Sequence, residues 1–221
     1  MTKGLKLGFV IVIGGIIMTL LSGCDKRNNR EWLENKFGTE LSRVYPTQNV
    51  EDLFKEFPDG FRIEQTHTDG DYDYEIELSG DSDTRSIKGT LTQINQGTGE
   101  KITTIYVEYK DKKFVFSDEA KAKIFWPYEG FLFQQLAVKK SFLNRLDMTD
   151  KHYNFQNGAF GIDYDIVDKM INNYLNEPKN KELKFRLGGS NSNRGYYYSV
   201  IFEDKANENY YFRETIAGTP K

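Results

Sequence analysis

The sequence predicts an α+β domain in which antiparallel β-sheet meanders carry helices packed on one face, with no βαβ units. Apolar residues recur first at the 3.6-residue period of helices and then, from Phe61, at the two-residue period of strands. The same change from helix to strands occurs again after Glu129. Helices followed by runs of strands favour an α+β domain over the alternating order of a βαβ fold.

Two helices are expected before the first strand. The first ends before Pro46 and has an apolar stripe at helical spacing, made of Leu33, Phe37, Leu41 and Val44. The second begins at a cap supplied by Thr47 or Asn49 and stops at the turn Pro58-Asp59-Gly60. Its apolar face consists of Val50, Leu53, Phe54 and Phe57.

A meander of about five strands is expected from Phe61 to Phe116. One strand alternates Tyr72, Tyr74, Ile76 and Leu78 with Asp71, Asp73, Glu75 and Glu77. One of its faces is therefore apolar and the other acidic, as in a half-buried antiparallel sheet. Further strands are expected from Ile87 to Ile94, from Ile102 to Tyr109 and from Phe114 to Phe116.

The second cycle begins with a helix of about 18 residues between Glu129 and Leu146. A hairpin from Tyr153 to Tyr164 follows, turning at Asn157-Gly158. Asp165 is expected to cap a short helix that Pro178 ends. Closing strands are expected from Leu183 to Leu187, from Tyr196 to Glu203 and from Asn209 to Ile216.

The only cysteine, Cys24, closes the run Leu21-Ser22-Gly23-Cys24 behind a short apolar segment. Lys3 and Lys6 supply the positive region of an export signal, and small residues precede the cut. We interpret Cys24 as the site of a diacylglyceryl group and Leu21, Ser22 and Gly23 as the signal-peptidase recognition residues. The apolar run is shorter than the roughly 20 residues of a membrane span, although an uncleaved N-terminal anchor is the alternative.

Three segments are expected: a lipoprotein signal peptide at 1–23, a polar tether at 24–30 and one α+β domain at 31–221, with possible halves at 31–118 and 129–221. Without residues 1–23 the chain has 28 basic and 33 acidic side chains and a formal charge of −5. These charges are interspersed, which argues against a nucleic-acid partner. With one cysteine, no intramolecular disulfide forms, and a monomer is expected.

No catalytic set, metal site or cofactor is expected. Asp69-Gly70-Asp71-Tyr72-Asp73 resembles the start of a calcium loop, but Tyr74 and Gly80 occupy positions where such a loop needs Gly and Glu. An acidic turn is favoured over a weak cation site. His67 and His152 are the only histidines, and Ser190 lacks the spacing of a hydrolase nucleophile.

Two aromatic triplets, Tyr196-Tyr197-Tyr198 and Tyr210-Tyr211-Phe212, stand in predicted strands. Neighbouring residues on a strand point to opposite faces, so each triplet places at least one ring outside. Cross-strand pairing over the core is favoured over a binding surface for carbohydrate or peptide, which is the alternative.

Several segments together resemble the tandem-type lipoproteins of the conserved staphylococcal antigen family. They are the run ending at Cys24, the run Tyr45-Pro46-x-x-Asn49-Val50-Glu51-Asp52-Leu53, the strand Gly89-x-x-x-x-Ile94-Asn95, and the tail from Leu183 through Phe202-Glu203 to Asn209-Tyr210-Tyr211-Phe212. The resemblance spans nearly the whole chain. It implies a non-enzymatic lipoprotein on the extracytoplasmic face of a Gram-positive cell membrane. The one functional residue of the family that the resemblance assigns in this chain is the lipid-bearing cysteine, at Cys24.

The resemblance further implies recognition by host innate receptors through the acylated N-terminus, with possible host-protein contacts in adhesion or entry. The alternative function is a solute-binding lipoprotein that serves a transporter. The short chain and the absence of two predicted βαβ lobes argue against that alternative.

Overall fold

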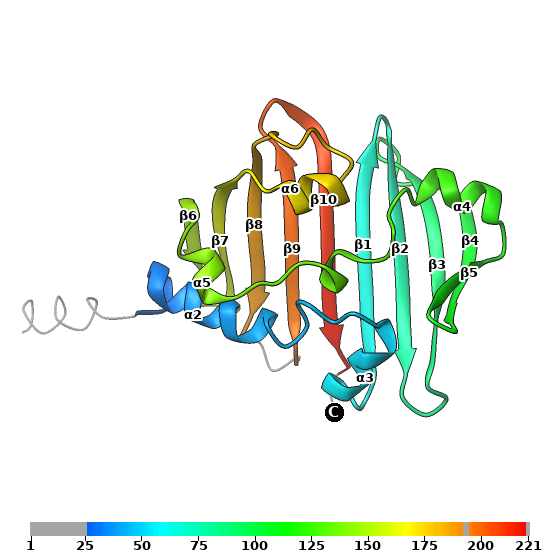
Figure 1. Ribbon diagram of the computed structural model, residues 1–221, viewed down its shortest axis with the longest axis horizontal. Coiled ribbons are helices and arrows are strands. Elements are labelled where there is room, and N and C mark those ends of the chain that lie inside the picture. The colour runs from blue at the N-terminus through cyan, green and yellow to red at the C-terminus, as the bar shows by residue number, and fades with distance from the viewer. Residues whose placement is uncertain (1–25, 192–194, 220–221) are drawn as a thin grey trace, which may run out of the picture.

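The computed structural model describes residues 26–191 and 195–219, and in it all the strands form one antiparallel sheet (Figure 1). The order is β5-β4-β3-β2-β1-β10-β9-β8-β7-β6. The strands are β1 (Phe61–Asp69), β2 (Tyr72–Asp81), β3 (Ser86–Asn95), β4 (Lys101–Lys110), β5 (Lys113–Phe116), β6 (Asp147–Tyr153), β7 (Ala159–Ile166), β8 (Leu183–Ser190), β9 (Tyr197–Asp204) and β10 (Asn207–Gly218). The predicted α+β class is confirmed.

Each run of five strands is a meander of neighbours in sequence, and the pairing of β1 with β10 joins the two runs. In that pairing Ile63 lies opposite Ile216 and His67 lies opposite Phe212. Short turns connect the predicted hairpins: Gly158 adopts a positive φ between β6 and β7, and Asp111 and Lys112 do so between β4 and β5. The first strand therefore pairs with the last, so segments 31–118 and 129–221 share one sheet.

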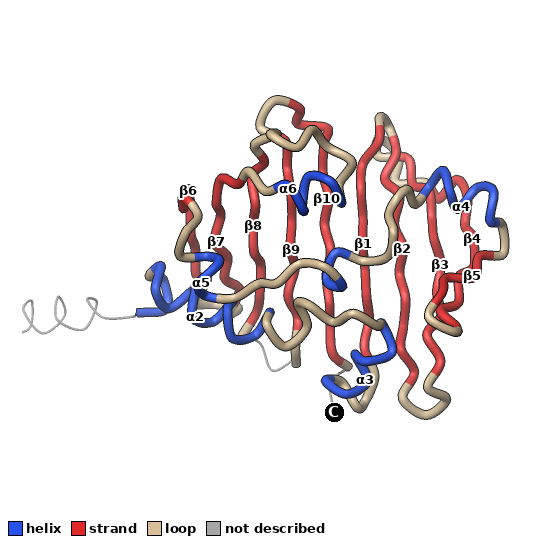
Figure 2. Tube along the Cα trace, viewed as in Figure 1, coloured by secondary structure: helices blue, strands red, loops and turns tan. Residues whose placement is uncertain are grey.

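Helices and loops cover one face of the sheet and leave the other open (Figure 2). The helical segments are η1 (Lys26–Asn28), α2 (Arg30–Leu41), η2 (Val50–Asp52), α3 (Leu53–Glu56), α4 (Glu119–Phe125), η3 (Leu132–Gln134), α5 (Lys140–Leu143) and α6 (Lys169–Tyr174). The core lies under this cover, where Phe37 and Leu41 of α2 are fully buried. No helix in residues 26–191 or 195–219 is long and apolar enough to cross a membrane.

The first two predicted helices are confirmed as α2 and as the η2–α3 pair. Asn29 caps α2, because its side chain accepts a hydrogen bond from the Trp32 amide at 2.7 Å. Gly38 lets α2 approach the start of α5, since a Cβ atom there would lie 2.5 Å from the Lys140 nitrogen.

The predicted helix of about 18 residues between Glu129 and Leu146 is wrong. Residues 127–139, here named the strap, cross the covered face with only the short η3 turn, and α5 follows them. The strap buries Phe131, Leu132 and Phe133 completely, and Val138 as well. Its apolar residues are more closely spaced than one helix stripe requires, because the strap lies flat on the core and buries several consecutive side chains.

The predicted cap of the next helix, Asp165, is also wrong. Asp165 and Ile166 belong to β7, and Asp168 caps α6 by accepting hydrogen bonds from the amides of Met170 and Ile171 at 2.9 and 3.1 Å. Strand β7 thus runs on to Ile166, which is buried, and the helix begins only after the exposed Val167 and the cap Asp168. Helix α4, which the Asp118 side chain caps, is absent from the helices predicted above.

Candidate functional site

The predicted lipid-attachment residue Cys24, with Leu21, Ser22 and Gly23, lies outside the described residues. The described chain begins two residues later, and it contacts the domain at once. Arg27 donates a hydrogen bond to the Tyr153 hydroxyl at 3.2 Å, and its guanidinium lies 4.9 Å from the Tyr153 ring centroid and 5.2 Å from that of Phe155. The tether predicted at 24–30 is therefore held to the β6–β7 hairpin from Arg27 onward.

Arg30 continues this attachment at the start of α2. Its guanidinium pairs with Glu34 at 2.7 Å and donates to the Leu146 carbonyl oxygen at 3.0 Å. Trp32 packs edge-on against Tyr153 and Phe160, with ring centroids 5.7 and 5.6 Å apart. The N-terminal segment, the β6–β7 hairpin and α2 form one packed unit, here named the anchor end.

Glu214 holds the strap to the centre of the sheet. Its fully buried carboxyl group accepts hydrogen bonds from the Tyr45 hydroxyl at 2.9 Å and from the amides of Leu132 and Phe133 at 2.8 Å each. Burial raises the pKa of Glu214 to about 8, and the three donors offset part of that rise. Sequence reasoning missed this residue, although it stands at the inward position between Phe212 and Ile216.

His67 lies in an aromatic cluster on the covered face. Its ring stacks on Tyr74 with centroids 5.2 Å apart and meets Tyr128 edge-on at 5.1 Å. Burial lowers the pKa of His67 to about 4, with Asp69 and Asp73 acting in the opposite direction. His152 is exposed on the edge strand β6, whereas His67 lies on β1, and four strands separate β6 from β1. The structure does not bring the two histidines together.

Glu214 gives the stability a defined dependence on pH. In the unfolded chain its carboxyl ionises near the ordinary pKa of 4.5, whereas in the folded chain it keeps its proton until about 8. We therefore expect the free energy of unfolding to fall as pH rises through this window, by on the order of 4 kcal/mol for this group. Glu214→Gln should lack that component, which chemical denaturation of both proteins from pH 4.5 to 8.5 would measure.

His67 has the opposite sign and supplies an internal check on that experiment. Its lowered pKa means that stability is lost as pH falls from about 6.5 towards about 4. His67→Phe should therefore abolish the loss of stability at low pH. The loss of stability between pH 6.5 and 8, which Glu214 causes, should remain. Equal pH profiles for the Glu214→Gln and unsubstituted proteins would contradict the assignment to Glu214.

Local hydrogen bonds stabilise the acidic turn between β1 and β2. The Asp73 carboxylate accepts from the Thr68 hydroxyl at 2.6 Å and from the Gln96 amide nitrogen at 2.8 Å. Gly70 adopts a positive φ that the turn requires. Within residues 26–191 and 195–219, no group of three or more His, Cys, Asp or Glu side chains is placed to hold a metal ion.

The acidic strand face of β2 lies on the open face of the sheet, among basic residues. Glu77 pairs with Arg62 at 2.8 Å, and Glu64 on the neighbouring β1 pairs with Arg213. Burial, followed by the charges of Glu64 and Glu77, raises the pKa of Glu75. The open face therefore carries a network of acidic and basic side chains, and Asp71 lies outside this network, in the turn.

The tyrosine triplets divide between the two faces, as strand alternation predicts. Tyr196 and Tyr198 are buried on the covered face, with ring centroids 4.7 Å apart, and Phe212 is fully buried. Tyr197 points to the open face and is 48% exposed. Most of these rings cover the core, and Tyr197 is exposed on the open face, where it is available for contacts with other molecules.

Exposed apolar side chains lie on both faces at the end of the sheet opposite the anchor end. Tyr106 on β4 is 72% exposed, Ile124 on α4 is 71% exposed, and Val115 on β5 is also exposed. Figure 1 shows α4, β4 and β5 at one end of the long axis and α2 and β6 at the other. We name Tyr106, Val115 and Ile124 the far-end residues.

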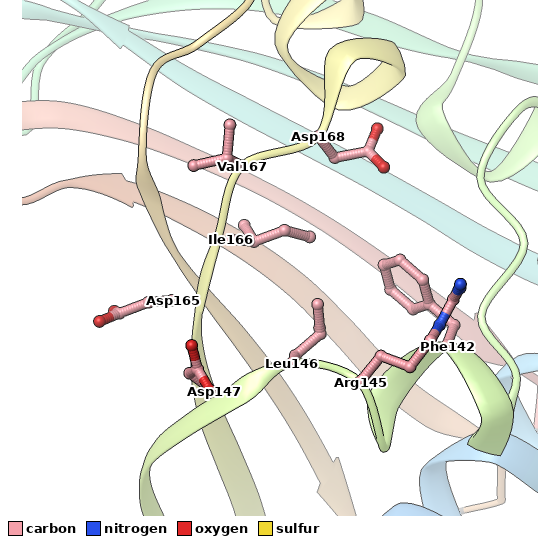
Figure 3. Close-up of a pocket in the computed structure, with 8 residues that line it drawn as sticks. All are labelled: Phe142, Arg145, Leu146, Asp147, Asp165, Ile166, Val167 and Asp168. Atoms are coloured by element: carbon pink, nitrogen blue, oxygen red, sulfur yellow. The ribbon is translucent and has the colours of Figure 1, made fainter.

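A hollow of about 350 Å³ lies between α5 and the end of β7 (Figure 3). Phe142, Leu146 and Ile166 form its apolar wall, and Arg145 stands at its rim. The Asp165 carboxylate turns away from Phe142 and pairs with Lys205, while Asp168 is occupied as the cap of α6. The Asp165 and Asp168 carboxylates therefore already have structural partners.

Comparison with known proteins gives structural similarities only. No family model matches the chain, and no curated protein matches its sequence. The fold is similar to the Mycobacterium tuberculosis lipoprotein LppX, with 9% identity over 81% of this chain and 93% of that one and a TM-score of 0.39. It is also similar to LprF from Mycobacterium bovis, with 8% identity over 81% and 91% and a TM-score of 0.36.

Proposed function

We propose that this protein is a lipoprotein of the extracytoplasmic face of a Gram-positive cell membrane, held there by a diacylglyceryl group on Cys24. The observation that carries the proposal is the run Leu21-Ser22-Gly23-Cys24, which contains the only thiol of the chain and follows an apolar export segment. Two acyl chains hold a protein on a membrane stably, whereas one binds only marginally. The anchor end agrees with this role, because the chain is packed against the folded domain from Arg27, three residues after the cysteine.

The folded domain acts without catalysis, through contacts with host proteins, as the resemblance to the tandem-type lipoproteins implies. Two groups of side chains support such contacts: the far-end residues Tyr106, Val115 and Ile124, and Tyr197 on the open face. Exposed aromatic residues contribute strongly to protein interfaces. The lipid would then account for stimulation of innate receptors, and the domain for adhesion or entry.

These two contributions are separable by experiment. We expect the lipidated protein to stimulate innate receptors and the chain from Asp25 onward to lose that activity, because the acyl groups are absent. We expect the same unlipidated chain to compete with the full protein for binding to host cells. Replacing Tyr106, Val115 and Ile124 together by Ser should weaken the competition several-fold, with receptor stimulation by the lipidated variant unchanged.

A second variant tests the other candidate surface. Replacing Asp71, Asp73, Glu75 and Glu77 by Ser alters the acidic strand instead, and it tests whether acids steer a basic partner. If the unlipidated chain neither binds cells nor competes, the domain has no adhesive role. If it stimulates receptors as strongly as the lipidated protein, the lipid has no part in recognition.

A further inference from the structure

The anchor end carries an exposed aromatic ring beside basic side chains. Phe155 at the tip of the β6–β7 hairpin is 58% exposed, although its ring contacts Tyr153, with centroids 4.8 Å apart, and the Arg27 guanidinium. Lys26 and Arg27 are both exposed. Among the described residues, the first acidic side chain after Arg27 is Glu31, and its carboxylate lies 4.0 Å from the Lys140 ammonium. An apolar ring and cations are thus presented together.

The tip that holds Phe155 is internally fixed. The Asn154 side chain accepts hydrogen bonds from the amides of Gln156 and Asn157 at 2.9 and 3.3 Å, and the Asn157 side chain accepts one from Ala159 at 2.9 Å. The adjacent Asn191 amide donates to the Gly158 carbonyl oxygen at 3.0 Å. A loop held in this way loses little conformational entropy when a surface covers it.

Chain length limits how far this tip can stand from the lipid. Three backbone steps separate Cys24 from Arg27, and a trans peptide spans about 3.8 Å, so their Cα atoms are at most roughly 11 Å apart. Arg27 is itself held against Tyr153 and Phe155. A lipid on Cys24 therefore brings the hairpin tip to the depth of the lipid headgroups.

We propose that Phe155, Lys26 and Arg27 form a membrane-contact surface, whose partner is the bilayer that holds the lipid on Cys24. This inference rests on the proposed lipid anchor. The Phe155 ring enters the interfacial layer, where amphipathic surfaces bury apolar side chains, and the two cations meet the phosphates of anionic headgroups. The domain is then fixed on the membrane by its anchor end, and the far-end residues are directed away from it.

A thiol-specific fluorophore can test this on the full lipidated protein. Cys24 is the only native cysteine, so with its thiol acylated an introduced cysteine is the only site that labels. Gln156→Cys places the label beside Phe155, and Lys123→Cys places it on exposed α4 as the matched control. In phosphatidylglycerol vesicles with spin-labelled headgroups, we expect several-fold stronger quenching at position 156 than at position 123.

Substitution of the contact residues gives a second measurement. Adding Phe155→Ser and Arg27→Ser to the Gln156→Cys protein should lower the quenching, whereas adding Val115→Ser at the far end should leave it unchanged. Melting temperatures of all variants show whether the fold is kept. Because Phe155 is exposed, its replacement should shift the melting temperature little.

The outcomes separate the inference from the proposed function, because intact mass reports lipidation of the same samples. A lipidated protein whose label at position 156 is quenched no more than the label at position 123 overturns the membrane-contact surface and leaves the anchor standing. A protein without lipid on Cys24 labels at two thiols and overturns the proposed function together with the inference.

Discussion

Replacing Glu214 by Ala is expected to lower the free energy of unfolding by about 3–5 kcal/mol near pH 6. The oxygens of the Glu214 carboxyl group, which is protonated at this pH, are the common acceptors for the Tyr45 hydroxyl and for the amides of Leu132 and Phe133, all of which are buried. Each buried donor left without an acceptor costs roughly 1–3 kcal/mol, and the shortened side chain leaves a void. The strap loses its attachment to β10 as a result.

Urea denaturation would measure this loss, and hydrogen exchange would locate it. Glu203→Ala is the matched control, because Glu203 is a half-buried acid of the open face that pairs with Arg186 at 3.2 Å. Surface pairs of that kind contribute about 1 kcal/mol or less. Amides of the strap should exchange faster in Glu214→Ala only. Equal midpoints for the two variants, with unchanged exchange in the strap, would show that Glu214 does not hold it.

Cys24→Ala is expected to abolish lipid attachment completely, because the chain has no second thiol. The variant should accumulate as unprocessed precursor in the membrane or be shed into the medium. Growth with a labelled fatty acid, followed by electrophoresis, would show the label on the native protein and none on the variant. Label retained on the Ala variant would refute the assignment of the lipid to Cys24.

Ser22→Ala serves as the control for that experiment. It keeps a small side chain at the position before Gly23, so the signal peptidase should still accept the run. Equal labelling of the native and Ser22→Ala proteins would attribute the loss in Cys24→Ala to the thiol itself.

The sequence predicted most strands because their alternation is local. The apolar set of β2 was predicted from its two-residue period, and Tyr74 and Leu78 do face the covered side with Ile76. The hairpin at Gly158 was likewise predicted from turn chemistry. Local patterns do not specify which meander edges meet, and so the pairing of β1 with β10 became visible only in the structure.

The strap shows where helical periodicity misleads. Phe131, Leu132 and Phe133 are consecutive and all fully buried, which no single face of a helix allows. Their burial depends on two amides bonded to Glu214, 81 and 82 residues away. One feature of the sequence indicates this arrangement: the acidic residue Glu214 stands at an inward strand position between Phe212 and Ile216. An ionisable side chain at such a position needs a specific partner, and that partner is distant in sequence.

The anchor end shows a similar limit. The basic residues after Cys24 were predicted as a polar tether, but Arg27 packs on Tyr153 and Phe155, more than 120 residues away. Cation–aromatic contacts of this kind have no sequence period that would reveal them.

Mass spectrometry of the N-terminal peptide of the protein recovered from Gram-positive cell membranes tests the central claim most directly. We predict a mature chain that begins at Cys24, with residues 1–23 removed and a diacylglyceryl group on the sulfur. An N-terminal peptide that retains residues 1–23, or one in which the Cys24 thiol is free, would contradict the account.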